Sequence, residues 1–116
     1  VEKPLYGLYE MYQLDKFPDE IIVCESMLDA LTCWVYGSYA GAMNGLGNSL
    51  CFKQLREIPS RKLILATYND ERGMAARANI RKNVPNKIIT EFIFPKNRKD
   101  VNDLSLLEFE NLEEIF

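Results

Sequence analysis

The residues of this sequence best suited to chemistry are three carboxylates. Glu25, Asp70 and Asp100 each come shortly after a run of apolar residues. A carboxylate at the end of a buried strand is costly unless it has a partner. Several carboxylates at one place also repel each other, and a divalent cation with oxygen ligands relieves that repulsion. The pattern therefore predicts a magnesium or manganese site at these three residues, suited to reactions of phosphate groups.

The composition excludes several other kinds of site. The chain has no histidine, which removes Ser-His and Cys-His nucleophiles and imidazole general bases. Its three cysteines are Cys24, Cys33 and Cys51, and none of them forms a C-x-x-C pair. Neither a disulfide framework nor a zinc site is indicated, so we expect three small buried side chains in a reducing, cytoplasmic setting.

The length and hydropathy are those of one globular domain. The chain has 116 residues, of which 47% are hydrophobic and 27% charged. No apolar run approaches the roughly 18 residues that a membrane-spanning helix needs, so we expect no membrane contact. Because the chain starts at Val1 rather than Met, we expect a piece of a longer protein, with the missing parts before Val1.

Short apolar runs alternate with segments of helical periodicity, and prolines and glycines separate them. This alternation predicts an α/β fold, a four-stranded, mainly parallel sheet flanked by helices. In such sheets the carboxyl ends of the strands meet at one edge, which is where ligands bind. The expected strands are 20–24, 39–43, 62–67 and 88–94.

Most of the acidic residues also have a plain structural interpretation. A side-chain oxygen at a helix N-terminus caps free backbone N–H groups, whatever the function. Glu25 is the hardest to explain by structure alone, because it directly follows a buried strand. The alternative stays open for Asp29, for Asn69 and Asp70, and for Asp100 and Asp103.

The charges are unevenly distributed along the chain. Residues 53–99 carry 12 Lys and Arg against 4 Asp and Glu, whereas the flanks carry 2 against 13. This segregation favours a cationic surface that binds nucleic acid, although charged runs are often only solvated. The predicted nucleic-acid contacts are Arg72, Arg77, Arg81, Lys96, Arg98 and Lys99.

Several of these motifs together resemble the Toprim domain, and most closely that of bacterial and phage primases. The resemblance covers about 20–107 and rests on Glu25, Asp29, the glycine-rich stretch 37–47, Tyr68-Asn69-Asp70-Glu71-Arg72-Gly73 and Lys99-Asp100-Val101-Asn102-Asp103.

The resemblance implies a role for each matching residue. Glu25 and Asp70 match catalytic positions, and both join Asp100 in binding the metal. Asp29, Asn69 and Asp103 match supporting positions, and Gly47 and Gly73 match structural glycines. One departure concerns the D-x-D motif, whose first aspartate falls on Tyr68. A neutral phenol is a poor magnesium ligand, so we expect weakened Mg²⁺ or Mn²⁺ binding.

The implied function is that of a primase catalytic-core fragment. Such a fragment takes part in metal-dependent nucleotidyl transfer that makes RNA primers from nucleoside triphosphates on single-stranded DNA, with a replicative helicase as a possible partner. We expect the isolated chain to be inactive. Two alternatives stay open: a degenerate Toprim module that binds nucleic acid or a partner, and a small Toprim nuclease. The implied organisation is a lead-in helix in 1–19, the Toprim domain in 20–107 and a helical tail in 108–116.

Overall fold

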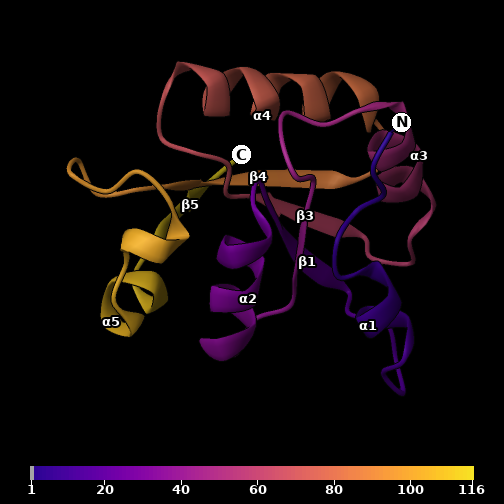
Figure 1. Cartoon of the computed structure of the whole chain (residues 1–116), viewed down its shortest axis with the longest axis horizontal. Coiled ribbons are helices and arrows are strands. Elements are labelled where there is room, and N and C mark those ends of the chain that lie inside the picture. The colour runs from indigo at the N-terminus through magenta and orange to yellow at the C-terminus, as the bar shows by residue number, and fades with distance from the viewer. Residues whose placement is uncertain (1) are drawn as a thin grey trace.

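A five-stranded sheet with helices on both of its faces forms the fold (Figure 1). The computed structural model describes residues 2–116, and Val1 lies outside them. The strand order is β2-β1-β3-β4-β5, with the first four strands parallel and β5 antiparallel to β4. The strands are β1 (Glu20–Cys24), β2 (Ala40–Ala42), β3 (Lys62–Leu65), β4 (Ile88–Ile93) and β5 (Glu113–Ile115).

The helices lie in two layers (Figure 1). Helices α3 and α4 cover one face of the sheet, and α2 and α5 cover the other. Within residues 2–116, no helix is long and apolar enough to cross a bilayer. The helices are α1 (Leu8–Tyr12), α2 (Met27–Val35), α3 (Ser49–Glu57), α4 (Glu71–Asn83), α5 (Leu106–Glu110) and the short 3₁₀ helix η1 (Val101–Asp103).

The two layers follow from the alternation of side chains along each strand. In β1, Ile21 and Val23 point to one face, whereas Ile22 and Cys24 point to the other. The first pair packs with residues of α3 and α4, and the second pair with residues of α2 and α5. Because β1 is buried on both faces, its sequence is a continuous apolar run.

The strand order reverses next to β1. The chain crosses from β1 to β2 on one side and then returns to β3 on the other side. In open parallel sheets, ligands bind outside the carboxyl ends of the strands at such a reversal. The segments that follow β1 and β3 therefore meet at the expected place for a site.

The predicted α/β fold with a mainly parallel sheet is confirmed, but two details of the prediction were wrong. The sheet has five strands rather than four, because β5 pairs with β4. The tail 108–116 is not helical beyond Glu110, where α5 ends. The extended segment that follows finds backbone partners in β4, and Glu114 also accepts a hydrogen bond from Thr90 at 2.9 Å.

Candidate functional site

Five side chains gather along the carboxyl edge of the sheet, and we call this group the rim: Glu25, Asp29, Tyr68, Asp70 and Asp100. Glu25 directly follows β1, and Asp29 lies in the first turn of α2. Tyr68 and Asp70 lie between β3 and α4, and Asp100 precedes η1. Three segments that are distant in the sequence thus meet at one edge, as the parallel topology requires.

Glu25 is the buried carboxylate at the reversal point, with only 7% of its surface exposed. Its Oε1 accepts a hydrogen bond of 2.8 Å from the backbone N–H of Tyr68. Burial raises the pKa of Glu25, and the N–H of Tyr68 opposes that rise. The charge of Asp70 raises the same pKa, whereas Arg72 and Lys99 lower it. A carboxyl group with a raised pKa is suited to proton transfer.

Asp29 is fully buried and joins α2 to the segment after β4. Its Oδ1 accepts the backbone N–H of Asn102 at 3.1 Å, and its Oδ2 accepts the hydroxyl of Ser26 at 3.0 Å. The hydroxyl oxygen of Ser26 in turn accepts the N–H of Asp29, which caps the start of α2. Burial, followed by the charge of Asp100, raises the pKa of Asp29 to about 6.

Asp70 caps α4 and also faces a cation. Its Oδ1 accepts the backbone N–H of Gly73 at 2.7 Å, and its Oδ2 lies 3.9 Å from Nζ of Lys99. A Cβ atom on Gly73 would lie 1.8 Å from the carbonyl oxygen of Tyr68, so this close approach requires glycine. The capping interpretation of Asp70 is therefore correct, and it leaves one carboxylate oxygen available.

Asp100 caps η1 by accepting the N–H of Asp103 at 3.1 Å, and burial raises its pKa. Two residues predicted to support the metal instead hold the loop before Asp100. Asn69 donates its backbone N–H to the carbonyl oxygen of Lys99 at 2.7 Å. Its side-chain amide donates to the carbonyl oxygen of Arg98 at 3.2 Å. Asp103 accepts the N–H of Lys99 at 2.9 Å.

Tyr68 occupies the position where the motif would place a carboxylate. Burial raises the pKa of its phenol, as do the charges of Asp29 and Asp100, although Ser26 opposes the rise. The phenol is therefore neutral near pH 7. Nζ of Lys99 lies 5.3 Å from the centre of the tyrosine ring, within the range of a cation–π contact.

The donor groups of the rim fit a hydrated cation better than a closed metal site. Within residues 2–116, no group of three or more acidic or cysteine side chains is arranged to hold a metal ion. Joint binding of a metal ion by Glu25, Asp70 and Asp100 stays a prediction. Magnesium, however, often binds through one or two carboxylates and several waters. Asp70, with 38% of its side chain exposed, and the neighbouring Glu25 fit that kind of binding.

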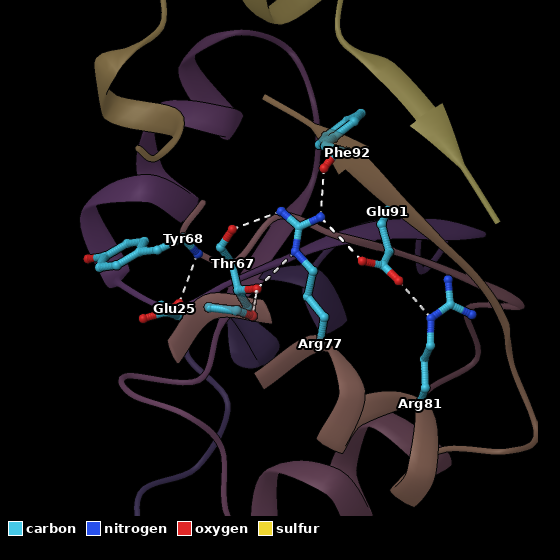
Figure 2. A network of polar contacts seen from close by, with 8 residues as sticks. Glu25, Thr67, Tyr68, Arg77, Arg81, Glu91 and Phe92 are labelled. Carbon is cyan, nitrogen blue, oxygen red and sulfur yellow. Dashed lines mark hydrogen bonds and ion pairs between the residues drawn. The ribbon is translucent and has the colours of Figure 1, made fainter. Parts of the chain in front are cut away.

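The predicted nucleic-acid contact at Arg77 was wrong, because this side chain is only 3% exposed and makes its contacts inside the protein (Figure 2). Its guanidinium group lies among Thr67, Glu91 and Phe92. Arg81 is half-buried, and its Nε donates to Glu91 at 2.7 Å. The sequence signal for the burial of Arg77 is its place beside Ala76 and one turn before Ile80, on the apolar stripe of α4.

Three cations of the basic stretch 53–99 pair with acidic residues of the flanks. Arg61 pairs with Asp19 at 2.9 Å, and Lys62 with Glu114 at 2.6 Å. Arg98 lies 3.1 Å from Glu108. Of the predicted contacts, Arg72, Lys96 and Lys99 are exposed. Two of these, Arg72 and Lys99, lie close enough to Glu25 to lower the pKa of its carboxyl group.

Comparison with protein families matches residues 22–105 to the family described as Toprim-like. This match covers well over half of the chain, and the protein belongs to that family. Comparison with curated proteins gives no match.

Two solved structures of DnaG share the fold. One, the DnaG catalytic core, has a TM-score of 0.69 and 20% sequence identity over 95% of this chain. The other, the DnaG primase catalytic domain bound to single-stranded DNA, has a TM-score of 0.64 and 23% identity over 94% of this chain. The chain spans 39% and 36% of the lengths of those two proteins.

Proposed function

We propose that this chain is the Toprim module of a primase-type enzyme, which joins nucleotides into an RNA primer on single-stranded DNA. The observation that carries the proposal is the buried Glu25 at the reversal of strand order, next to Asp70. The membership in the Toprim-like family and the likeness to the DnaG catalytic core support it.

In the proposed chemistry a primer 3′-hydroxyl attacks the α-phosphate of a nucleoside triphosphate. The bond between the α-phosphorus and the bridging oxygen breaks, pyrophosphate leaves, and the hydroxyl proton passes to a base. Glu25, whose pKa is raised by burial, is placed to accept or return a proton at its free carboxylate oxygen. Asp70 and Glu25 would hold a divalent cation, Mg²⁺ or Mn²⁺, which when bound neutralises charge on phosphate oxygens. Arg72 and Lys99 lie near these carboxylates and supply positive charge for the phosphates.

The partners in this proposal are a single-stranded DNA template and nucleoside triphosphates, with a replicative helicase as a further partner and the cytoplasm as the place of action. One of the similar DnaG structures is described as bound to single-stranded DNA, which supports the choice of template. The chain spans 39% and 36% of the lengths of the two DnaG proteins. In this proposal, further domains of the enzyme are therefore needed to complete primer synthesis. We expect the isolated chain to bind substrates without extending a primer.

Calorimetric titration with a non-hydrolysable ribonucleoside triphosphate tests this function. We expect binding that requires Mg²⁺ and that falls at least about tenfold in Asp70→Asn, since the amide keeps a capping oxygen but lacks the charge. Glu113→Gln, an exposed carboxylate in β5, is the matched control and leaves the affinity unchanged. If the wild type binds the nucleotide equally well without Mg²⁺, a metal-dependent role is excluded.

A second candidate function is a module that binds single-stranded DNA without performing chemistry. Tyr68 favours it, because this neutral phenol replaces a carboxylate in a rim that holds no three-group metal site within the described residues. The ammonium group of Lys99, 3.9 Å from Asp70, already offsets part of the negative charge. This candidate predicts DNA binding that is unaffected by Mg²⁺ removal, together with no binding of the nucleotide.

A further inference from the structure

One peptide group, between Thr67 and Tyr68, lies between the Glu25 carboxylate and the Arg77 guanidinium (Figure 2). The carbonyl oxygen of Thr67 accepts a hydrogen bond of 2.9 Å from Nη2 of Arg77. The N–H of Tyr68, on the other side of the same peptide group, donates to Glu25 at 2.8 Å. The two charged side chains thus hold the two ends of one peptide dipole.

The geometry of a peptide group makes these two contacts interdependent. The group is planar and trans, so the direction of its carbonyl fixes the direction of its N–H. A hydrogen bond to the carbonyl also polarises the group and strengthens the N–H as a donor. A peptide group that Arg77 did not hold could rotate and turn its N–H away from Glu25.

Arg77 makes several further polar contacts inside the protein (Figure 2). Its Nη1 donates to the carbonyl of Phe92 at 2.6 Å, and its Nε donates to the hydroxyl of Thr67 at 3.1 Å. Glu91 lies 3.4 Å from Nη1, and the ring of Phe94 lies 5.7 Å from the guanidinium carbon. The buried guanidinium therefore joins α4 to the segments at the ends of β3 and β4.

We propose that Arg77 is a positioning residue for Glu25, acting through the peptide group between Thr67 and Tyr68. The importance of Glu25 in catalysis rests on the proposed function, whereas the contact does not. The burial of Arg77 supports the proposal, since a buried cation that held only structure could be replaced by apolar packing.

Amide hydrogen exchange, measured by NMR on the whole chain, tests the proposal. The N–H of Tyr68 lies outside the strands, yet it should exchange slowly in the wild type because Glu25 accepts it. The reference is the N–H of Ala66, which donates to the carbonyl of Val23 at 2.9 Å. Arg77→Lys keeps the charge but cannot bond the carbonyls of Thr67 and Phe92 in the same way. We expect it to speed exchange at Tyr68 about tenfold relative to Ala66.

Arg81→Gln is the matched control. It removes a contact to the same Glu91 without touching the peptide group before Tyr68. A loss of stability alone speeds exchange at Tyr68 and Ala66 together, and this is the result expected for the control. If Arg77→Lys also changes both amides by the same factor, Arg77 has only a structural role and the proposal is wrong.

A second measurement needs no change at Arg77. Glu25→Gln removes the carboxylate charge and so weakens the hydrogen bond that the Tyr68 N–H donates. The NMR chemical shifts of the Arg77 guanidinium group should change in turn, because the guanidinium binds the carbonyl of the same peptide group. Unshifted guanidinium signals, or a fast-exchanging Tyr68 amide in the wild type, would overturn the proposal even if Arg77→Lys failed to fold. Neither measurement depends on nucleotide or DNA binding, so their outcome is separate from that of the proposed function.

Discussion

Two acidic residues of the rim, Asp70 and Asp100, have structural roles that are compatible with the proposed site. Asp70 caps α4 with one oxygen and turns the other toward Lys99, and Asp100 caps η1 while it raises the pKa of Asp29. Capping and function are therefore compatible interpretations of one carboxylate. Substitutions that keep a capping oxygen but remove the charge are needed to separate the two roles.

The buried Asp29 should make stability depend on pH. Its pKa is about 6 in the folded chain against an ordinary value of 3.8, so the folded state holds an extra proton between these values. The free energy of unfolding should therefore fall as pH rises from about 4 to about 6, by at most about 3 kcal/mol from this group.

Urea denaturation between pH 4 and pH 7 measures this effect, with Asp29→Asn as the comparison. The variant should show a shallower fall, although not a flat profile, because burial also raises the pKa values of Glu25 and Asp100. Equal slopes for the wild type and Asp29→Asn would show that Asp29 is not the titrating group.

Gly73→Ala should destabilise the chain, although alanine normally stabilises a helix. The added Cβ would lie 1.8 Å from the carbonyl oxygen of Tyr68, which is backbone and cannot move aside freely. We expect a loss of more than about 2 kcal/mol in urea denaturation. Ala78→Gly, at an exposed position of the same helix, should cost only the usual propensity difference of about 1 kcal/mol. A smaller loss at Gly73 than at Ala78 would contradict the close approach.

Individual residues could be predicted from the sequence where local position decides their role. Glu25 and Asp70 follow strands, and the parallel topology brought them to the same edge as expected. The burial of Arg77 has a sequence signal in its place on the apolar stripe of α4, but its partners do not. The carbonyls of Thr67 and Phe92 that accept its guanidinium come together only in the folded chain. The hydrogen bond from Asn69 to the carbonyl of Arg98 also depends on the fold, because the two residues are 29 positions apart.

At the scale of elements, β1, β3 and β4 and the helices between the strands carry clear local signals, whereas β2 (Ala40–Ala42) carries a weaker one. Apolar runs mark the strands, and capping residues, glycines or prolines mark the ends of most helices. The predicted alternation of strands and helices along the chain was correct. The strand β5 has no such signal, since it is only three exposed residues. It forms because β4 offers a free edge and because Lys62 lies 2.6 Å from the carboxylate of Glu114.

The contacts of Glu114 should account for much of the stability of β5. Its Oε2 accepts hydrogen bonds from Nζ of Lys62 and from the hydroxyl of Thr90. We expect Glu114→Ala to lower the free energy of unfolding by about 1 kcal/mol in chemical denaturation. Glu113→Ala, the exposed neighbour, should change it by less than about half as much. Equal effects would mean that the carboxylate contacts do not stabilise β5.

At the scale of the whole molecule, charge segregated in the sequence is redistributed by folding. Arg61, Lys62 and Arg98 face acidic residues from the flanks. The sequence reveals the imbalance but not the pairing, because the partners are up to 52 residues apart. Folding thus pairs part of the cationic stretch with the acidic flanks and leaves other cations exposed, among them Arg72 and Lys99 near the rim.

Single-stranded DNA binding should therefore depend on the cations near the rim. We expect Lys99→Gln to weaken binding several-fold in a fluorescence anisotropy titration and to reduce its salt dependence by about one counterion. Arg61→Gln, which removes a cation already paired with Asp19, is the control and should have little effect. Equal losses in both variants would indicate nonspecific attraction to net positive charge.

The central claim is that the rim still binds a divalent cation although Tyr68 replaces a carboxylate. Paramagnetic broadening of NMR signals by Mn²⁺ tests it most directly, in the wild type, Asp70→Asn and Tyr68→Asp. We predict broadening centred on Glu25 and Asp70 in the wild type, lost in Asp70→Asn and stronger at lower Mn²⁺ concentration in Tyr68→Asp. A wild type without broadening, with binding seen only in Tyr68→Asp, would contradict the claim and leave a Toprim module that binds without metal chemistry.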